Sequence, residues 1–144
     1  MEENKTYKLS KNSKKNIKDV DSRLKTLVNR VIKKSPHDFG IPGNGGFRTA
    51  QQQNNLFHQK PKVTQLDGFK NKSYHQTGNA FDIFVYDEHG ACWDCKDKYK
   101  QIANLFKEEY ATMKEEGIFE DAEIFAWGGD WIRFKDLPHF QISK

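Results

Sequence analysis

The sequence contains only two cysteines, Cys92 and Cys95, which are too few for the disulfide framework of a small secreted domain. It has no run of about 18 apolar residues, so we expect no stable insertion into a membrane. Its first 20 residues also lack the apolar stretch of about 7 to 15 residues that a signal peptide needs. We therefore expect the protein to be made in the cytoplasm without a signal peptide.

Hydrophobic residues make up only 35% of the 144-residue chain, whereas aromatic residues reach 13%. This composition predicts a small core built largely from aromatic rings. The length is that of one domain, and no linker or internal repeat divides residues 1–144. Residues 1–18 are polar and rich in lysine, and we expect them to be extended or loosely ordered.

The net charge of +4 favours an anionic partner, and nucleic acid, a phospholipid surface and an acidic wall polymer all have that sign. A nucleic-acid surface would place aromatic residues among basic ones. Here the aromatic residues follow the spacing of buried faces instead, so we expect no nucleic-acid partner. The N-terminal lysines are consistent with a solvated face or with contact to an anionic envelope.

Three helices are predicted from apolar spacing and from end signals. The first starts near Val20, is capped by Asp21 or Ser22 and ends before Pro36. The second starts at Thr49, with Gln52 as the partner in a capping box, and stops by residue 61. The third and longest includes residues 99–113 and ends at Gly117.

Alternation of side chains predicts one strand over residues 80–86, "AFDIFVY", with both faces largely covered. Two shorter strands are predicted near residues 123–127 and 140–143, and residues 39–46 and 87–95 are expected to be loops. This order of elements predicts an α+β domain with a small, mostly antiparallel sheet flanked by helices.

His75, Asp82 and His139 are candidate metal ligands, because a hydrolytic zinc site takes three protein ligands and keeps one position for water. Gly78 would let the chain bend between the first two. By themselves, His75 and Asp82 are more commonly an ordinary turn histidine and an ordinary strand-edge aspartate than a pair of metal ligands. Asp136 lies three residues before His139, where its carboxylate could serve as a general base.

The segment "SYHQTGNAFD" (73–82) matches the S-x-H-x-x-G-x-A-x-D pattern of the zinc D-Ala-D-Ala carboxypeptidase family, which includes phage L-alanyl-D-glutamate endopeptidases. "GGFRTAQQQ" (45–53) resembles the arginine-bearing segment of that family, and "WGGDWIRFKDLPHFQ" (127–141) resembles its C-terminal metal segment. "SPHDFGI" and "KVTQLDGFKNKS" are similar to connecting stretches of its endolysin branch. The resemblance runs from about residue 8 to the C-terminus.

The resemblance implies a hedgehog/D,D-peptidase fold with one Zn²⁺ per chain on the three candidate ligands. It implies that Asp136 is the base and that Arg48 stabilises an oxyanion or a substrate carboxylate, for which a guanidinium fork is suited. Ser73 is expected to form a hydrogen bond with the substrate. Trp131 is expected to lie in the core or in the pocket wall, and it is a candidate substrate contact.

The family implies a zinc-dependent endolysin that hydrolyses the L-Ala–D-Glu bond of the peptidoglycan stem peptide. We expect a monomer without a separate wall-binding domain, which waits in the host cytoplasm and reaches the periplasmic wall once the membrane is permeabilised. The alternatives are a D,D-carboxypeptidase and a non-catalytic zinc-containing wall-binding module. Asp136 and Arg48 argue against the module, since neither is needed to hold zinc, and an Asp rather than a Glu as base matches the endopeptidase branch.

Two segments lie outside the family pattern. His89, Cys92 and Cys95 form an H-x-x-C-x-x-C array that is consistent with a second metal site, a reversible disulfide or two unremarkable thiols. "GNGG" (43–46) resembles a small insertion that would reshape the rim of the pocket.

Overall fold

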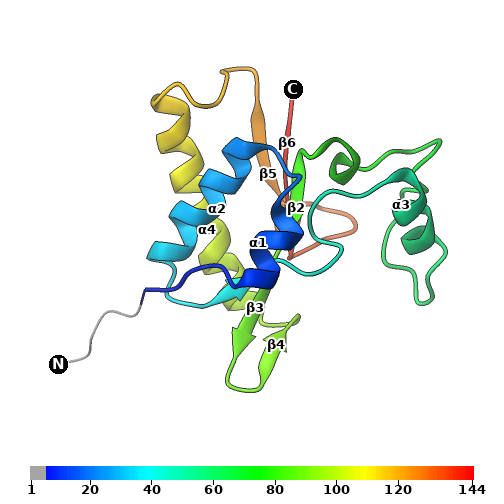
Figure 1. Cartoon of the computed structure of the whole chain (residues 1–144), viewed down its shortest axis with the longest axis horizontal. Coiled ribbons are helices and arrows are strands. Elements are labelled where there is room, and N and C mark those ends of the chain that lie inside the picture. The colour runs from blue at the N-terminus through cyan, green and yellow to red at the C-terminus, as the bar shows by residue number, and fades with distance from the viewer. Residues whose placement is uncertain (1–5) are drawn as a thin grey trace.

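A computed structural model of the chain describes residues 6–144 (Figure 1). The helices are α1 (Lys11–Ile17), α2 (Ser22–Lys34), α3 (Ala50–Phe57) and α4 (Lys96–Glu115), with short 3-10 helices η1 (Tyr74–Thr77) and η2 (Gly128–Asp130). The strands are β1 (Phe39–Gly40), β2 (Ala80–Asp82), β3 (Phe84–Asp87), β4 (Gly90–Cys92), β5 (Ile124–Trp127) and β6 (His139–Ser143). The α+β class predicted from the sequence is confirmed.

The strands form two antiparallel sheets of three strands each, in the orders β1-β3-β4 and β2-β6-β5. In the second sheet Phe81 lies opposite Phe140 and Asp82 lies opposite His139. Successive residues of a strand point to opposite faces. The same pairing therefore directs one pair of residues to the core and the other to the opposite face.

The single strand predicted over residues 80–86 is wrong in one respect, because the chain leaves one sheet and enters the other at Ile83. The Ile83 N–H still donates to the carbonyl of Pro138 at 2.9 Å, in register with the pairing of β2 and β6, but the proline has no N–H to return the bond and the pairing ends there. Phe81, Ile83 and Val85 are all fully buried, so the alternation continues across the break. Side-chain patterning therefore gave no sign of it. The short strands β1 and β4 also occupy segments that were predicted to be loops.

The N-terminal segment is more ordered than predicted. Residues 1–5 lie outside the described part of the chain, but residues 11–17 form α1, capped by Ser10, whose hydroxyl accepts from the N–H of Ser13. Leu9, Ser13 and Ile17 are buried. Only two of these three residues are apolar and the rest of the segment is mostly polar. The apolar spacing was therefore too sparse to predict a helix here.

The three predicted helices are confirmed together with their end signals. The Asp21 carboxylate caps α2 by accepting from the N–H of Arg23. Thr49 and Gln52 form the expected capping box at the start of α3. Gly117, at a φ of 81°, follows the end of α4. No helix in residues 6–144 is long and apolar enough to cross a membrane.

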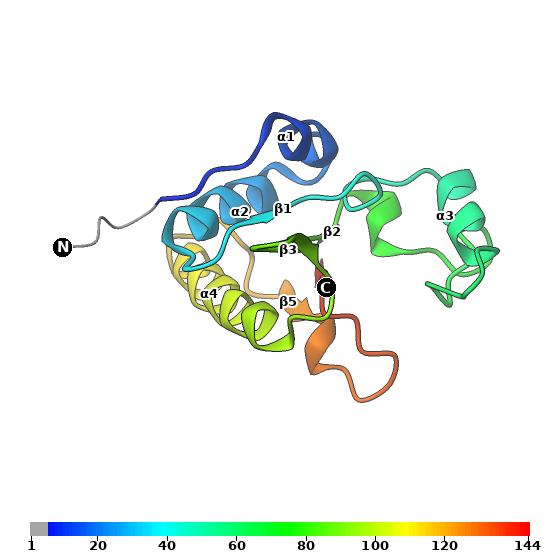
Figure 2. The same cartoon turned by 90° about the horizontal axis from the view of Figure 1, so that it is seen from below.

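The core lies between the helix pair α2 and α4 and the central strands, while α3 projects on the other side of β2 (Figures 1 and 2). Its centre is a cluster of aromatic rings. Phe106 of α4 lies 4.6 Å from Phe140 and 5.4 Å from Phe81, measured between ring centroids. Phe81 and Phe140 stack at 5.2 Å. The core built from rings that the composition predicted is confirmed.

Helix α1 is attached to the rest of the fold by a buried hydrogen bond, in which the hydroxyl of Ser13 accepts from the N–H of Ile41 at 2.9 Å. Ser13→Ala would leave this N–H without its partner. We expect the free energy of unfolding to fall by about 1–3 kcal/mol, measured by urea denaturation. Ser22→Ala, at the exposed start of α2, is the control. Equal effects of the two substitutions would contradict a stabilising role for this contact.

Candidate metal centre and active site

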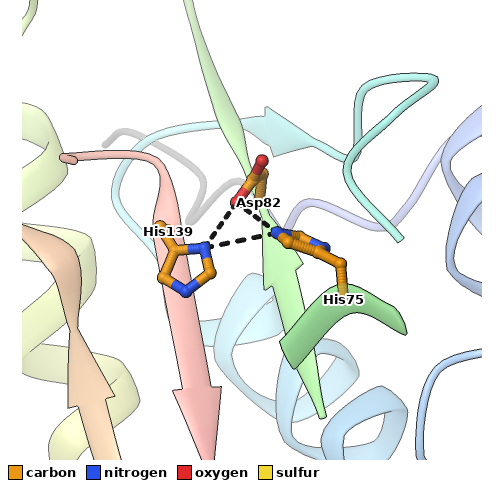
Figure 3. Close-up of side chains that lie close together, drawn as sticks. All are labelled: His75, Asp82 and His139. Atoms are coloured by element: carbon orange, nitrogen blue, oxygen red, sulfur yellow. Dashed lines mark hydrogen bonds and ion pairs between the residues drawn. The ribbon is translucent and has the colours of Figure 1, made fainter. Parts of the chain in front are cut away.

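His75, Asp82 and His139 converge on one point, as Figure 3 shows. Asp82 Oδ1 lies 3.1 Å from His75 Nε2 and 3.1 Å from His139 Nδ1. The two imidazole nitrogens are 3.3 Å apart. Both histidines are buried. The structure thus brings together three residues that the sequence separates by up to 64 positions.

Short-range structure orients the first two of these residues. The Ser73 hydroxyl caps η1 by accepting from the N–H of His75 at 3.2 Å. Gly78 ends η1 at a φ of 73°, a conformation that glycine adopts without strain. The chain then turns directly into β2, so that Asp82 comes to lie beside His139 of β6. Ser73 is therefore a positioning residue for His75, while its contact with substrate stays a prediction.

The outer nitrogen of each imidazole donates a hydrogen bond to a protein oxygen. His75 Nδ1 donates to the carbonyl of Gly46 at 2.8 Å, and His139 Nε2 donates to Gln141 Oε1 at 2.8 Å. These bonds leave the lone pairs of the inner nitrogens directed at the site, next to a carboxylate. Three electron-pair donors in contact repel one another unless a cation lies between them.

The donor set fits a zinc ion in identity and in size. Two imidazoles and one carboxylate are ordinary zinc ligands, and tetrahedral bonds of about 2.0–2.1 Å place neighbouring donor atoms about 3.3 Å apart. The three separations of 3.1, 3.1 and 3.3 Å are close to that value. The residues present are therefore suited to hold a metal of this kind.

The electrostatics of the site favour the ionised form of Asp82 and the charged form of His139. Burial by itself would raise the pKa of Asp82, but the two histidines outweigh it and hold that pKa well below its usual range. Burial opposes a charge on His139, yet the Asp82 carboxylate, which accepts a hydrogen bond from the charged imidazole, outweighs it and raises the pKa of His139. The carboxylate of Asp82 therefore remains ionised and ready to bind a cation.

Arg48 holds the outer oxygen of this carboxylate. Its Nη2 donates to Asp82 Oδ2 at 3.0 Å, its Nη1 to Gln53 Oε1 at 3.0 Å and its Nε to the carbonyl of Asn44 at 2.7 Å. Arg48 thus positions a candidate ligand, a role that the sequence did not reveal. Gln53, fully buried in α3, was also missed as a site residue, and the one available signal was a polar side chain on the inward face of that helix.

The glycine-rich segment before Arg48 supplies two further supports. The N–H of Asp82 donates to the carbonyl of Gly45 at 2.7 Å, and the carbonyl of Gly46 accepts from His75. A Cβ on Gly46 would lie 2.0 Å from the carbonyl oxygen of Asn16 in α1. Only glycine allows the two backbones to come this close. Residues 43–46, which were expected to reshape the rim of the pocket, therefore also support the candidate ligands His75 and Asp82.

Asp136 lines the same cavity as the three candidate ligands. Burial and the nearby charge of Asp82 raise the pKa of its carboxyl, an effect that His139, His75 and Arg48 reduce. Its backbone is fixed by hydrogen bonds from its N–H to the carbonyl of Gly128, at 3.0 Å, and from the N–H of His139 to its own carbonyl, at 3.1 Å. A more basic carboxylate beside the donor set suits proton transfer.

Gly128 permits the close approach of that backbone. A Cβ at this position would lie 2.2 Å from the carbonyl oxygen of Asp136, which is too close for any other residue without a shift. The sequence shows two adjacent glycines here, but it does not indicate that the backbone of Asp136 packs against the first of them.

The cavity has a volume of about 1010 Å³ and is open to solvent. Besides residues 73–75 and Asp82, its walls come from residues 42–48, from the end of α3 and the segment after it (residues 56–66), from residues 131–141 and from Trp93. Trp131 lines this cavity and its ring lies 5.3 Å from that of His139, while contact with substrate stays a prediction.

Cys92 and Cys95 form a disulfide, which selects one of the three alternatives left open by the sequence. His89 is exposed and lies beside Glu88, with 3.5 Å between Nε2 and Oε1. A metal site on both thiolates and this histidine is therefore not what the structure contains.

Residues 5–141 match the family of phage L-alanyl-D-glutamate peptidases. The chain is 34% identical over 104 residues to the peptidoglycan L-alanyl-D-glutamate endopeptidase CwlK of Bacillus subtilis, covering 67% of this chain and 57% of CwlK. It is 29% identical over 140 residues to the L-alanyl-D-glutamate peptidase of Escherichia phage T5, covering 96% of this chain and 91% of that protein.

Among solved structures, the fold is similar to that of the Serratia marcescens L-Ala D-Glu endopeptidase ChiX, with a TM-score of 0.73 and 25% identity over 96% of this chain and 91% of ChiX. The match to the family extends over nearly the whole sequence and includes every residue of the site described above. The chain therefore belongs to the phage L-alanyl-D-glutamate peptidase family.

Proposed function

We propose that the protein is a zinc-dependent endopeptidase that hydrolyses the L-Ala–D-Glu bond of the peptidoglycan stem peptide. The observation that carries this proposal is the convergence of His75 Nε2, Asp82 Oδ1 and His139 Nδ1 in a cavity that also contains Asp136. The family and the names of the relatives from Bacillus subtilis and phage T5 support the choice of bond.

In this proposal His75, Asp82 and His139 hold one zinc ion per chain. The chemistry that zinc supplies in such a site is Lewis-acid activation of water and of a carbonyl group. The hydrogen bonds to Gly46, to Gln141 and from Arg48 fix the orientation of the ligands before any metal arrives. Loss of an outer contact of this kind typically costs about 10- to 100-fold in metal affinity or activity.

Asp136 is proposed as the general base and acid. Its carboxylate accepts a proton from the attacking water and returns that proton to the amine of D-Glu as the peptide bond breaks. The raised pKa of Asp136 makes its carboxylate a better proton acceptor than an exposed one. The acidic partner Asp82 stays ionised under the same conditions, so the two carboxylates have separate roles.

Arg48 is proposed to act on the substrate as well as on Asp82. Its three hydrogen bonds to the protein use three of the five N–H groups of a guanidinium. Because Arg48 lines the cavity, its remaining donors are available to an oxyanion or to the carboxylate of D-Glu, which lies on the carbon next to the scissile nitrogen.

The setting proposed for this activity is phage lysis, in which a monomeric, single-domain enzyme present in the host cytoplasm reaches the periplasmic peptidoglycan after the membrane is opened. The phage family and the phage T5 relative support it. Cleavage between L-Ala and D-Glu detaches cross-linked peptides from the glycan, which weakens the wall as a whole.

Metal binding is the first test. We expect His139→Ala to lose nearly all zinc, because one of three ligands is removed and the remaining two cannot complete the site. Zinc per chain would be measured by mass spectrometry after dialysis. His37→Ala is the control, because His37 forms a hydrogen bond with Gln101 and neither residue lines the cavity. A fully loaded His139→Ala protein would remove this residue from the metal site.

Asp136→Asn tests the proposed base. The substitution keeps the shape of the side chain and removes its basicity, so we expect zinc to stay bound while the rate falls by about 10²–10⁴. Asp130→Asn is the matched control, since Asp130 lies in η2 and pairs with the exposed Lys107 of α4. Unchanged turnover would exclude Asp136 as the base, and loss of zinc would make it a ligand.

The bond itself is tested by digesting purified sacculi with the zinc-loaded protein and analysing the products by mass spectrometry. We expect new L-Ala carboxyl ends and D-Glu amino ends, with falling turbidity. Release of free D-Ala without these ends would identify a D,D-carboxypeptidase. Binding to sacculi without any new ends would identify a non-catalytic module.

A further inference from the structure

The loop Cys92–Cys95 carries an aromatic side chain to the wall of the active-site cavity. Trp93 lines this cavity together with the candidate metal ligands, and 52% of its surface is exposed. The sequence around it, "HGACWDC", is the segment that the family pattern did not explain. The exposed part of this indole ring is an apolar surface that a ligand in the cavity can pack against.

The loop that presents Trp93 is fixed at both ends. Cys92 belongs to β4, opposite Val85, and its carbonyl accepts from the hydroxyl of Tyr99 at 2.8 Å. The same hydroxyl accepts from the N–H of Val85 at 3.3 Å. Cys95 immediately precedes α4, and its disulfide to Cys92 closes the loop.

The ring of Trp93 is also supported from one side. It lies 5.8 Å from the ring of Phe84 in β3, measured between centroids. With the loop closed and one flank packed, the indole loses little freedom when a ligand covers its other surface. The arrangement is that of a preorganised binding wall.

Charge is distributed unevenly around the cavity. Apart from Arg48, the lysines and arginines that line it are Lys62, which follows α3, and Arg133 and Lys135, which lie between η2 and β6. The lining residues from the segment after β1, which include Pro42 and Gly43, are uncharged up to Arg48. In Figure 1, α3 lies to the right of β2, whereas β4, which leads into the Trp93 loop, lies below it.

The stem peptide has a matching asymmetry about the bond proposed to be cut. On the D-Glu side it carries the α-carboxylate of D-Glu and the carboxylates of the diamino acid that follows. On the L-Ala side it carries a methyl group, a lactoyl ether and the sugar ring, all uncharged. Carboxylates favour the cationic walls, and the flat C–H face of a sugar ring favours an indole.

We infer that Trp93 is a specificity-determining residue that packs on the sugar attached to the L-Ala side of the substrate, and that the Cys92–Cys95 disulfide positions it. This inference rests on the proposed function. It assigns a direction to the substrate, with the glycan toward Trp93 and the acidic peptide toward Lys62, Arg133 and Lys135. The preference for glycan-linked peptide then resides in a loop outside the metal site.

Two substrates that differ only in the sugar test this inference. One is the disaccharide-tripeptide, and the other is the same tripeptide carrying only the lactoyl group. For the zinc-loaded Trp93→Ala protein we expect KM on the first substrate to rise about tenfold, the loss typical of a buried aromatic contact, with kcat within about twofold. On the lactoyl peptide we expect both constants to stay within about twofold of wild type.

Tyr86→Ala is the matched control. Tyr86 lies on the same hairpin and contacts the same Phe84, at 4.8 Å between ring centroids, but it is not among the residues that line the cavity. We expect it to change neither KM. An equal rise in KM on both substrates for Trp93→Ala would place the contact on the peptide and overturn the inference, as would no rise on either.

The disulfide is tested with the Cys92→Ser/Cys95→Ser protein, which avoids reductants that bind zinc. We expect KM to rise on the disaccharide substrate only, by less than in Trp93→Ala. Adding Trp93→Ala to this protein should give no more than the effect of Trp93→Ala alone, because both changes remove one interaction. Additive effects, or no effect of the serine substitutions, would overturn the positioning role.

Calorimetric binding separates this inference from the proposed function. In the Asp136→Asn background, we expect Trp93→Ala to weaken binding of the disaccharide-tripeptide about tenfold and to leave the lactoyl peptide unchanged. If wild-type protein cuts neither substrate but this binding difference is found, the proposed hydrolysis fails while the role of Trp93 stands. If both substrates are cut and no difference is found, the role of Trp93 fails alone.

Discussion

The antiparallel pairing of β2 with β6 is the constraint on which both the core and the site depend. Phe81 opposite Phe140 stacks in the core, and the next pair, Asp82 opposite His139, lies on the other face in the candidate metal centre. A slip of one residue would exchange these faces, placing a carboxylate in the ring cluster and a phenyl group in the site. The apolar core therefore fixes the register that places two of the three donors.

Around this pair, the fold brings together two imidazole nitrogens and a carboxylate that repel one another unless a proton or a metal ion lies between them. The cost is met by hydrogen bonds on their outer atoms, which come from the glycine-rich segment, from Gln141 and from Arg48. A group of residues that are unfavourable neighbours without a bound ion is expected where function, and not stability, has determined the residues. Helix α1 participates indirectly, because Asn16 lies against Gly46.

The cavity walls differ in character from the metal centre. The centre is built on strands and a 3-10 helix, whereas the walls are mostly loops with exposed apolar residues, such as Val63 at 53% and Phe134 at 71%. Phe134 adopts a φ of 54°, which is unusual for a bulky residue and is found mostly where function constrains the backbone. In the proposed function, chemistry and substrate selection thus belong to separate parts of the chain, a common division in enzymes.

The sequence by itself determined the three longer helices with their caps, the strands β5 and β6, the class of fold and the three residues of the candidate metal centre, because these depend on local spacing or on a family motif. Only the tertiary structure decided where residues 80–86 change sheets, that residues 11–17 form a helix, and that Gln53, Gly46 and Gly128 support the site. The tertiary structure also decided that Cys92 and Cys95, on either side of Trp93 and Asp94, form a disulfide. The physical reason is the range of the interactions: helix caps and side-chain alternation act between residues a few positions apart and leave a pattern in the sequence. Contacts such as Ile83 with Pro138, or Gly46 with Asn16, join a backbone group to a distant segment, and no local pattern encodes them.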